Sequence, residues 1–111
     1  MTYEEFVRLA LSLPETEESL YYGEPAVKRE GRAMFASREN GCSVTIKLDW
    51  DTLDELVVAS PDLYFQTPHQ ETWPWMTANL GAMTEDQAEE LLRACWEDAP
   101  KPGKRRKLPL T

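Results

Sequence analysis

Apolar residues recur at helical spacing near both ends of the chain and at every second position through much of the middle. The first helical stretch carries Phe6, Leu9, Ala10 and Leu13. Thr2 precedes this stretch, and Glu5 follows Thr2 by three residues, a spacing typical of a capping box. Because Pro14 interrupts helical hydrogen bonding, the pattern predicts an N-terminal helix that ends before it.

A second capping-box spacing, Thr84 with Gln87, opens the clearest helix of the sequence. Its apolar positions follow the i, i+3, i+4 pattern and are Ala88, Leu91, Leu92, Cys95, Trp96 and Ala99. The pattern predicts a C-terminal helix with one buried face, ending at Pro100.

Between Ala26 and Leu48 the period of the apolar positions changes to two, with turn signals at Glu30-Gly31 and at residues 39–41. This pattern predicts a meander of three antiparallel strands. In its last strand, one face carries Cys42, Val44, Ile46 and Leu48, and the other carries Ser43, Thr45 and Lys47. We expect the first face, Cys42 included, to lie in the core and the second to be wet.

A middle helix and a hairpin complete the predicted fold. Asp49 or Asp51 can cap a helix that stops before Ser60-Pro61, and its apolar positions are Trp50, Leu53, Leu56 and Val57. Residues 63–65 and 73–80 then form two strands joined by a polar loop. The sequence therefore predicts an α+β fold of two layers, in which an antiparallel sheet of about five strands packs against helices in the order helix, meander, helix, hairpin, helix.

Composition adds the expectation of one small soluble domain. The chain has 111 residues, of which 41% are hydrophobic, enough for one core. No apolar run reaches the roughly 18 to 20 residues that span a bilayer, and Glu4 and Glu5 stand where a secretion signal would be basic. Cys42 and Cys95 belong to no close pair, so we expect reduced thiols and a cytoplasmic monomer that contacts no membrane.

Charge divides the chain at Pro100. The five cations beyond it, with no acid among them, are Lys101, Lys104, Arg105, Arg106 and Lys107. Residues 1–100 keep seven cations against 20 acids, a net charge of −13. We expect residues 101–111 to form a basic, disordered tail that attracts nucleic acid weakly and without sequence preference, or that serves only solubility, while the body repels phosphates.

Several short motifs, in this order and spacing, resemble the MmcQ/YjbR family. They are Tyr22-Gly23-Glu24-Pro25-Ala26-Val27 before the meander, Phe65-Gln66-Thr67-Pro68-His69 in the hairpin loop, and Trp73-Pro74-Trp75 after it. The resemblance covers roughly residues 2 to 100. It implies that family's fold, similar to the CyaY (frataxin-like) arrangement, and it implies DNA binding, the activity with which the family is commonly labelled.

Two sets of residues in the hairpin region are candidates for chemistry. His69 is the one histidine and lies in a polar loop, where it can act as a general base, bind a ligand or simply brace the loop. Four aromatic residues near it either offer a platform on which a flat ligand stacks or fill the core: Tyr64, Phe65, Trp73 and Trp75. We find no phosphate loop, nucleophile elbow or zinc-protease motif in the sequence.

The remaining polar clusters favour no metal site or cofactor. Cys42, Cys95 and His69 lack the paired spacing of zinc ligands. The acids near the N-terminus are typical of a solvated face, although carboxylates can also bind a hard cation. The acids that follow the first helix indicate a solvated connection to a turn at residues 23–25. These acids are Glu4, Glu5, Glu15, Glu17 and Glu18.

Three functions follow from these candidates. The first is a non-catalytic module that recognises a small molecule or a protein through the Thr67–Trp75 region, with ligand contacts at Tyr22, Thr67, His69, Trp73 and Trp75. The second is DNA binding through the basic tail. The third is an enzyme of unknown reaction that uses His69.

Overall fold

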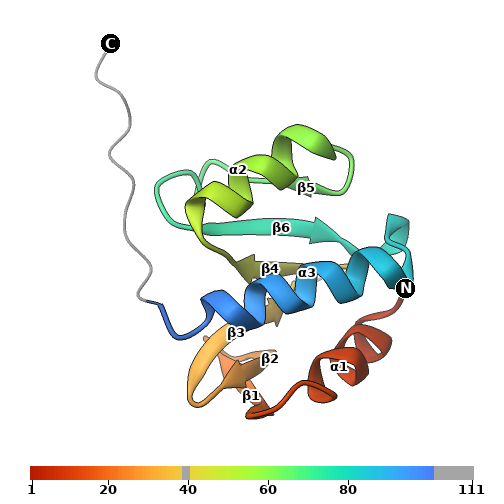
Figure 1. The fold of residues 1–111 in the computed structure, drawn as a ribbon, viewed down its shortest axis with the longest axis vertical. Helices are drawn as coiled ribbons and strands as arrows, with labels where there is room; N and C mark the ends of the chain where they lie inside the picture. Colours follow the sequence, from red (N-terminus) through yellow and green to blue (C-terminus); the bar gives the residue numbers. More distant parts are fainter. Residues whose placement is uncertain (39–40, 102–111) are drawn as a thin grey trace.

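The computed structural model describes residues 1–38 and 41–101, and in them a six-stranded antiparallel sheet carries three α-helices (Figure 1). The strands lie side by side in the order β1-β2-β3-β4-β6-β5. The elements are α1 (Tyr3–Leu11), β1 (Thr16–Tyr21), β2 (Glu24–Arg29), β3 (Arg32–Ser37), β4 (Ser43–Lys47), α2 (Trp50–Ala59), β5 (Tyr64–Phe65), β6 (Trp75–Asn79), a 3₁₀ turn (Leu80–Ala82) and α3 (Glu85–Asp98). The predicted α+β class and the order of its helices are confirmed, and the sheet has one more strand than expected.

The additional strand is β1, where the sequence led us to expect an acidic connection. Its residues pair with β2 from Thr16 opposite Arg29 to Tyr21 opposite Glu24. β1 is an edge strand, so it needs only one neighbour, and its acids Glu17 and Glu18 are exposed. The prediction was wrong because main-chain pairing at a sheet edge does not require an apolar face, and charged edge residues are common.

Two tight turns connect β1, β2 and β3. Tyr22 and Gly23 have φ of 51° and 81°, and Glu30 and Gly31 have φ of 48° and 83°. Two-residue hairpin loops of type I′ need positive φ at both positions, a conformation that glycine adopts easily and tyrosine adopts at a cost. The turn predicted at Glu30-Gly31 is therefore confirmed, and Tyr22 is held at the tip of the β1–β2 hairpin.

The core lies on one face of the sheet. Val44, Ile46 and Leu48 are buried on the predicted face of β4 and its continuation. Cys42 is exposed, so its assignment to the core was wrong. The alternation of faces holds only inside a paired strand, and β4 begins at Ser43, one residue after Cys42.

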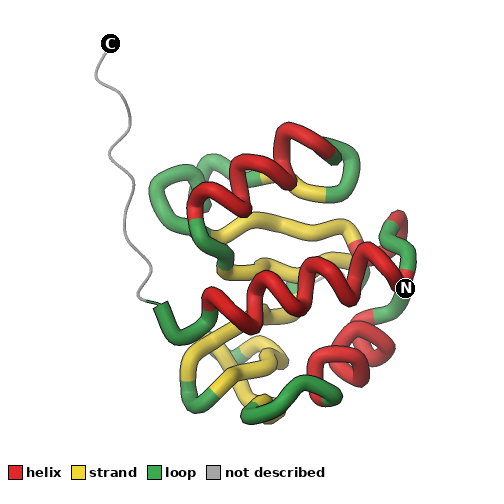
Figure 2. The backbone as a smooth tube through the Cα atoms, in the orientation of Figure 1, coloured by secondary structure: helices red, strands yellow, loops and turns green. Residues whose placement is uncertain are grey.

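All three helices contribute to this core. Figure 2 shows α3 crossing the central strands, and Leu91, Leu92 and Cys95 of α3 are buried together with Phe6 of α1 and Leu53 of α2. The predicted caps are present: capping boxes join Thr2 to Glu5 and Thr84 to Gln87, and Asp49 caps α2. Among the described residues, no helix is both long and apolar enough to cross a membrane.

Candidate functional site

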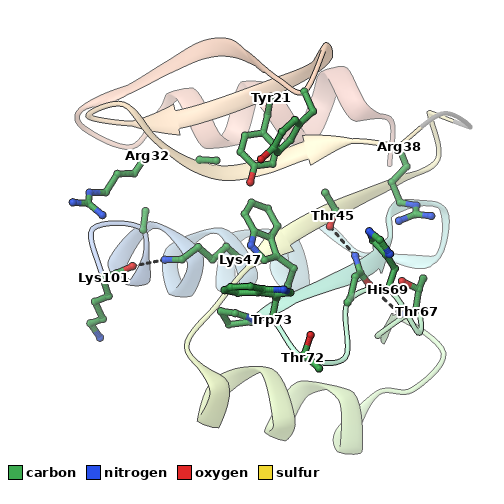
Figure 3. A pocket seen from close by; sticks show the side chains of 16 residues that line it. Tyr21, Arg32, Arg38, Thr45, Lys47, Thr67, His69, Thr72, Trp73 and Lys101 are labelled. Atoms are coloured by element: carbon green, nitrogen blue, oxygen red, sulfur yellow. Dashed lines mark hydrogen bonds between the residues drawn. The ribbon is translucent and has the colours of Figure 1, made fainter. Parts of the chain in front are cut away.

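A cleft of about 1280 Å³ opens on the face of the sheet opposite the core (Figure 3). Strand pleating produces this arrangement, because Thr45 and Lys47 alternate along β4 with the core residues Val44 and Ile46. The cleft is lined by Tyr21, Tyr22, Arg32, Ala33, Arg38, Thr45, Lys47, Thr67, His69, Gln70, Thr72, Trp73, Pro74, Trp75, Ala99 and Lys101.

Curvature of the sheet makes this face concave. β1 and β6 are separated by three strands, so in a flat sheet they would lie roughly 19 Å apart at the usual spacing between neighbours. The ring of Tyr21 on β1 nevertheless stacks on the ring of Trp75 on β6, with centroids 5.3 Å apart and planes 20° apart. A register shift in the β2–β3 pairing at Val27/Lys28 adds to the twist. The two aromatic residues therefore close the cleft across its floor.

The aromatic side chains differ in what their rings contact. Tyr22 meets Tyr21 edge-on, with centroids 4.6 Å apart, which extends the stack of Tyr21 on Trp75. Trp73 is 47% exposed, and its ring makes no aromatic contact with any residue in the described ranges. Trp73 thus lines the cleft with about half of its surface accessible to solvent.

Two glutamines hold the loop that carries Trp73. The side-chain amide of Gln66 donates to three carbonyl oxygens, those of Gln70, Trp73 and Trp75, at 2.8 to 3.0 Å. Gln70 is only 8% exposed and donates to the hydroxyl of Thr45 at 2.8 Å, while its carbonyl accepts from Thr77 at 3.1 Å. These hydrogen bonds pin residues 66–75 to the open face, so the loop is preorganised.

The charge of the cleft is opposite to that of the body. Four of its lining side chains are cations, Arg32, Arg38, Lys47 and Lys101, and none of the lining residues is Asp or Glu. Figure 3 shows Arg32, Lys47 and Lys101 on one side of Trp73 and Arg38 with His69 on the other. The net charge of −13 led us to expect a uniformly repulsive body, but the lining of the cleft carries cations and no acid, so the net value does not describe the cleft.

Lys47 is the most constrained of these cations. Its ammonium donates to the main-chain carbonyls of Asp98 at 3.0 Å and Lys101 at 2.5 Å, which ties the end of α3 to the floor of the cleft. Burial lowers the pKa of Lys47, and the nearby cation Arg32 lowers it further, while the carboxylate of Asp98 opposes the shift. The Lys47 side chain is thus partly desolvated and held in place by two main-chain carbonyls.

Asp98 interacts with two cations of the cleft and partly offsets their charge. Its carboxylate is 3.1 Å from the ammonium of Lys101 and accepts a 3.0 Å hydrogen bond from the main-chain N–H of Asp49. The hydrogen bond to Asp98 raises the pKa of Lys101. Asp98 is 6% exposed, so it acts on the cleft through Lys101 and Lys47 without lining it.

The structure brings the sequence-derived ligand candidates together. Tyr22, Thr67, His69, Trp73 and Trp75 all line the cleft. Of the other aromatic candidates, Tyr64 is buried in the core and Phe65 is partly exposed outside the lining. Sequence reasoning had placed Lys101 in the basic tail, and it missed Tyr21, Arg32, Arg38 and Lys47 as site residues, although period two already placed Thr45 and Lys47 on the wet face.

The remaining candidates fall in different places. Cys42 is exposed and Cys95 is buried, and no group of three His, Cys, Asp or Glu side chains in residues 1–38 and 41–101 is arranged to hold a metal ion. The five N-terminal acids are exposed. Of the tail cations, Lys101 lines the cleft, whereas Lys104, Arg105, Arg106 and Lys107 lie outside the described residues.

No protein-family model matches the chain, and no curated protein matches it. The resemblance to the MmcQ/YjbR family and to the CyaY-like arrangement therefore stays a prediction made from short motifs.

Proposed function

We propose that this protein is a binding module that holds an anionic ligand with a planar ring in the cleft. The observation that carries the proposal is the lining itself, in which four cations and an open Trp73 ring occur together and no acid intervenes. Ligand sites typically combine an apolar or aromatic wall with a few convergent polar groups, and cations select the ligand's charge.

The hydrogen-bonded loop of residues 66–75 also supports a binding function. Gln66 and Gln70 fix the backbone on both sides of Trp73 before any ligand arrives, so little loop entropy is lost on binding. The stack of Tyr21 on Trp75 likewise fixes the floor. Preorganisation of this kind raises affinity for a small ligand without new contacts.

The four tryptophans provide the test. Trp73 and Trp75 line the cleft, whereas Trp50 and Trp96 pack against the core, where the indole N–H of Trp96 donates to the carbonyl of Pro14 at 2.8 Å. We expect aromatic carboxylates, sulfonates or phosphates, screened by NMR on the full chain, to shift the indole N–H signals of Trp73 and Trp75 only. Equal shifts at Trp50 and Trp96, or no shift with any of these ligands, would contradict the proposal.

A single-stranded nucleic acid is the second candidate, because it also combines phosphates with flat bases. Aromatic platforms beside cations are typical of proteins that bind single strands. Lys101 lines the cleft, so the basic sequence that follows it starts there. The acidic body outside the cleft disfavours a duplex, which would lie across a wider surface.

Salt dependence separates the contribution of the tail from that of the cleft. If all five tail cations contact phosphates of a single strand, they contribute about −3.5 to the log–log slope of affinity against salt, in addition to the contribution of the other cleft cations. Replacing Lys104, Arg105, Arg106 and Lys107 by alanine should then make the slope less steep by about 2.8 and leave the contribution of the cleft, as measured by fluorescence anisotropy with a short oligothymidine. Arg8→Ala with Arg93→Ala, which removes exposed cations on α1 and α3, is the control and should leave the slope unchanged.

A further inference from the structure

The two halves of the cleft are not equivalent. One half, to one side of Trp73, is lined by Arg32, Lys47 and Lys101, and the half on the other side is lined by Arg38 and His69 (Figure 3). In the first half the charges are close enough that Arg32 and Lys101 both lower the pKa of Lys47. A concentration of like charges is unfavourable in the empty cleft, and a ligand with more than one negative charge relieves it.

Two side chains in this half keep donors available to a ligand. The ammonium of Lys47 has three N–H groups, and its two carbonyl bonds to Asp98 and Lys101 leave one more. Arg32 is exposed and forms no ion pair with any residue in the described ranges. Its guanidinium presents a planar fork of N–H groups that matches two oxygens of a phosphate.

Trp73 supplies the second recognition element in the same half. Its exposed ring lines the same cleft, with these donors to one side of it (Figure 3), and residues 66–75 are held by the Gln66 and Gln70 hydrogen bonds. Stacking of a nucleobase on an aromatic side chain contributes on the order of ten-fold to affinity. A ligand that spans both elements must therefore carry a flat ring at one end and a multiply charged group at the other.

We infer that the ligand of the cleft is a nucleoside phosphate, whose base stacks on Trp73 and whose phosphates bind Arg32 and Lys47. This inference rests on the proposed function and names the class of ligand. A single carboxylate or sulfonate neutralises only one of the three cations, whereas the phosphates of a nucleoside diphosphate carry two or more negative charges. Lys101, already paired with Asp98, contributes less than the other two.

The test compares whole and partial ligands on the full-length chain. We expect ADP to bind at least ten-fold more tightly than either adenosine or pyrophosphate, as measured by calorimetry and by the shift of the Trp73 indole signal. Trp73→Ala should weaken ADP and adenosine about ten-fold and leave pyrophosphate unchanged. Arg32→Ala should weaken ADP and pyrophosphate about ten-fold and leave adenosine unchanged, and Arg93→Ala, which removes the same charge from α3, should weaken none of the three.

The outcomes distinguish this inference from the proposed function. If pyrophosphate binds as tightly as ADP, or if Trp73→Ala leaves ADP binding intact, the nucleoside phosphate assignment is wrong. If no nucleotide binds but an aromatic carboxylate or sulfonate shifts Trp73 and Trp75, the inference fails and the proposed function stands. If oligothymidine binds far more tightly than ADP, the ligand is a polymer and the inference also fails. Both side chains are exposed, so an unchanged unfolding midpoint will show that each variant is folded.

Discussion

The two faces of this sheet come from the same alternating strands but have opposite chemistry. The face under the helices is sealed by apolar side chains such as Phe35, Ile46 and Leu91. The open face presents cations and aromatic rings to solvent and is closed only by the hairpin tip and the 66–75 loop. The sealed face stabilises the fold in proportion to the total apolar area that it buries. Ligand binding at the open face depends instead on the exact placement of a few side chains.

This difference predicts unequal sensitivity to substitution, with the largest effect on the sealed face. Phe35 is fully buried and meets the rings of Phe6 and Tyr3 at 4.8 and 6.2 Å. Phe35→Ala should lower the free energy of unfolding by about 3–5 kcal/mol, because it removes buried area and leaves a cavity. Trp73→Ala should cost less than about 1 kcal/mol, since half of the ring is already in water. Urea unfolding measures both, and equal losses would show that the cleft is part of the core.

The same contrast explains what the sequence could predict. The core face of β4 and the buried stripe of α3 followed from period and caps alone, because burial requires only that apolar residues share a side. β1 was missed since both of its faces are poor in core residues and its acids resemble those of a loop. Cys42 was misplaced because the period was extended one residue beyond the strand.

Some residues of the cleft could be predicted from the sequence and others could not, for a physical reason. Residues 67–75 contribute several of its side chains from one stretch of chain, so a local motif identified them. Lys47 is paired with Trp75 in the register of β4 and β6, and Arg32 lies on β3. Tyr21 on β1 reaches Trp75 only because the sheet is curved. Curvature depends on bulges and twist that no periodic pattern encodes.

The second-largest effect should come from the network that joins the loop to the open face. Gln70→Ala leaves the hydroxyl of Thr77, which is buried, without its acceptor, so we expect a loss of about 1–3 kcal/mol in the free energy of unfolding. Hydrogen exchange at the main-chain N–H groups of Trp73 and Trp75 should also accelerate. Glu71→Ala, at an exposed position in the same loop, is the control. If both variants behave alike, the amide network does not hold the loop.

A smaller effect should appear at high pH, where ionisation of Tyr3 on the sealed face lowers the stability of the fold. Burial raises the pKa of Tyr3 to about 12, with the carboxylates of Glu18 and Glu4 adding to the shift, and the unfolded chain titrates near 10. The stabilisation by neutral Tyr3 is therefore complete below pH 10 and is lost as the pH rises toward 12. Its size is on the order of 1 kcal/mol, discounted because the phenol is only half buried.

Tyr3→Phe isolates this contribution from the other titrating groups. Burial also raises the pKa of Tyr21 beside the cleft and lowers that of Lys47, but both groups titrate identically in the two proteins. Urea unfolding at pH 9, 10 and 11 should show the wild type losing stability relative to Tyr3→Phe as the pH rises. Parallel pH profiles would mean that the sealed face does not desolvate Tyr3.

The smallest effect lies at the tip of the β1–β2 hairpin, where the open face is held by a strained residue. Tyr22 has a φ of 51° and is 91% exposed, so its ring buries little area that could offset the strain of this backbone conformation. Asparagine tolerates a positive φ, whereas β-branched residues strongly disfavour it. Tyr22→Asn and Tyr22→Val both remove the contact with Tyr21, but only the valine keeps the full strain. We expect the asparagine variant to be more stable than the valine variant by about 0.5–1 kcal/mol, while both lose affinity for ligands of the cleft. Equal stability of the two variants would show that the turn has another conformation. Undiminished affinity would remove Tyr22 from the site and leave the stack of Tyr21 on Trp75 to form the floor of the cleft alone.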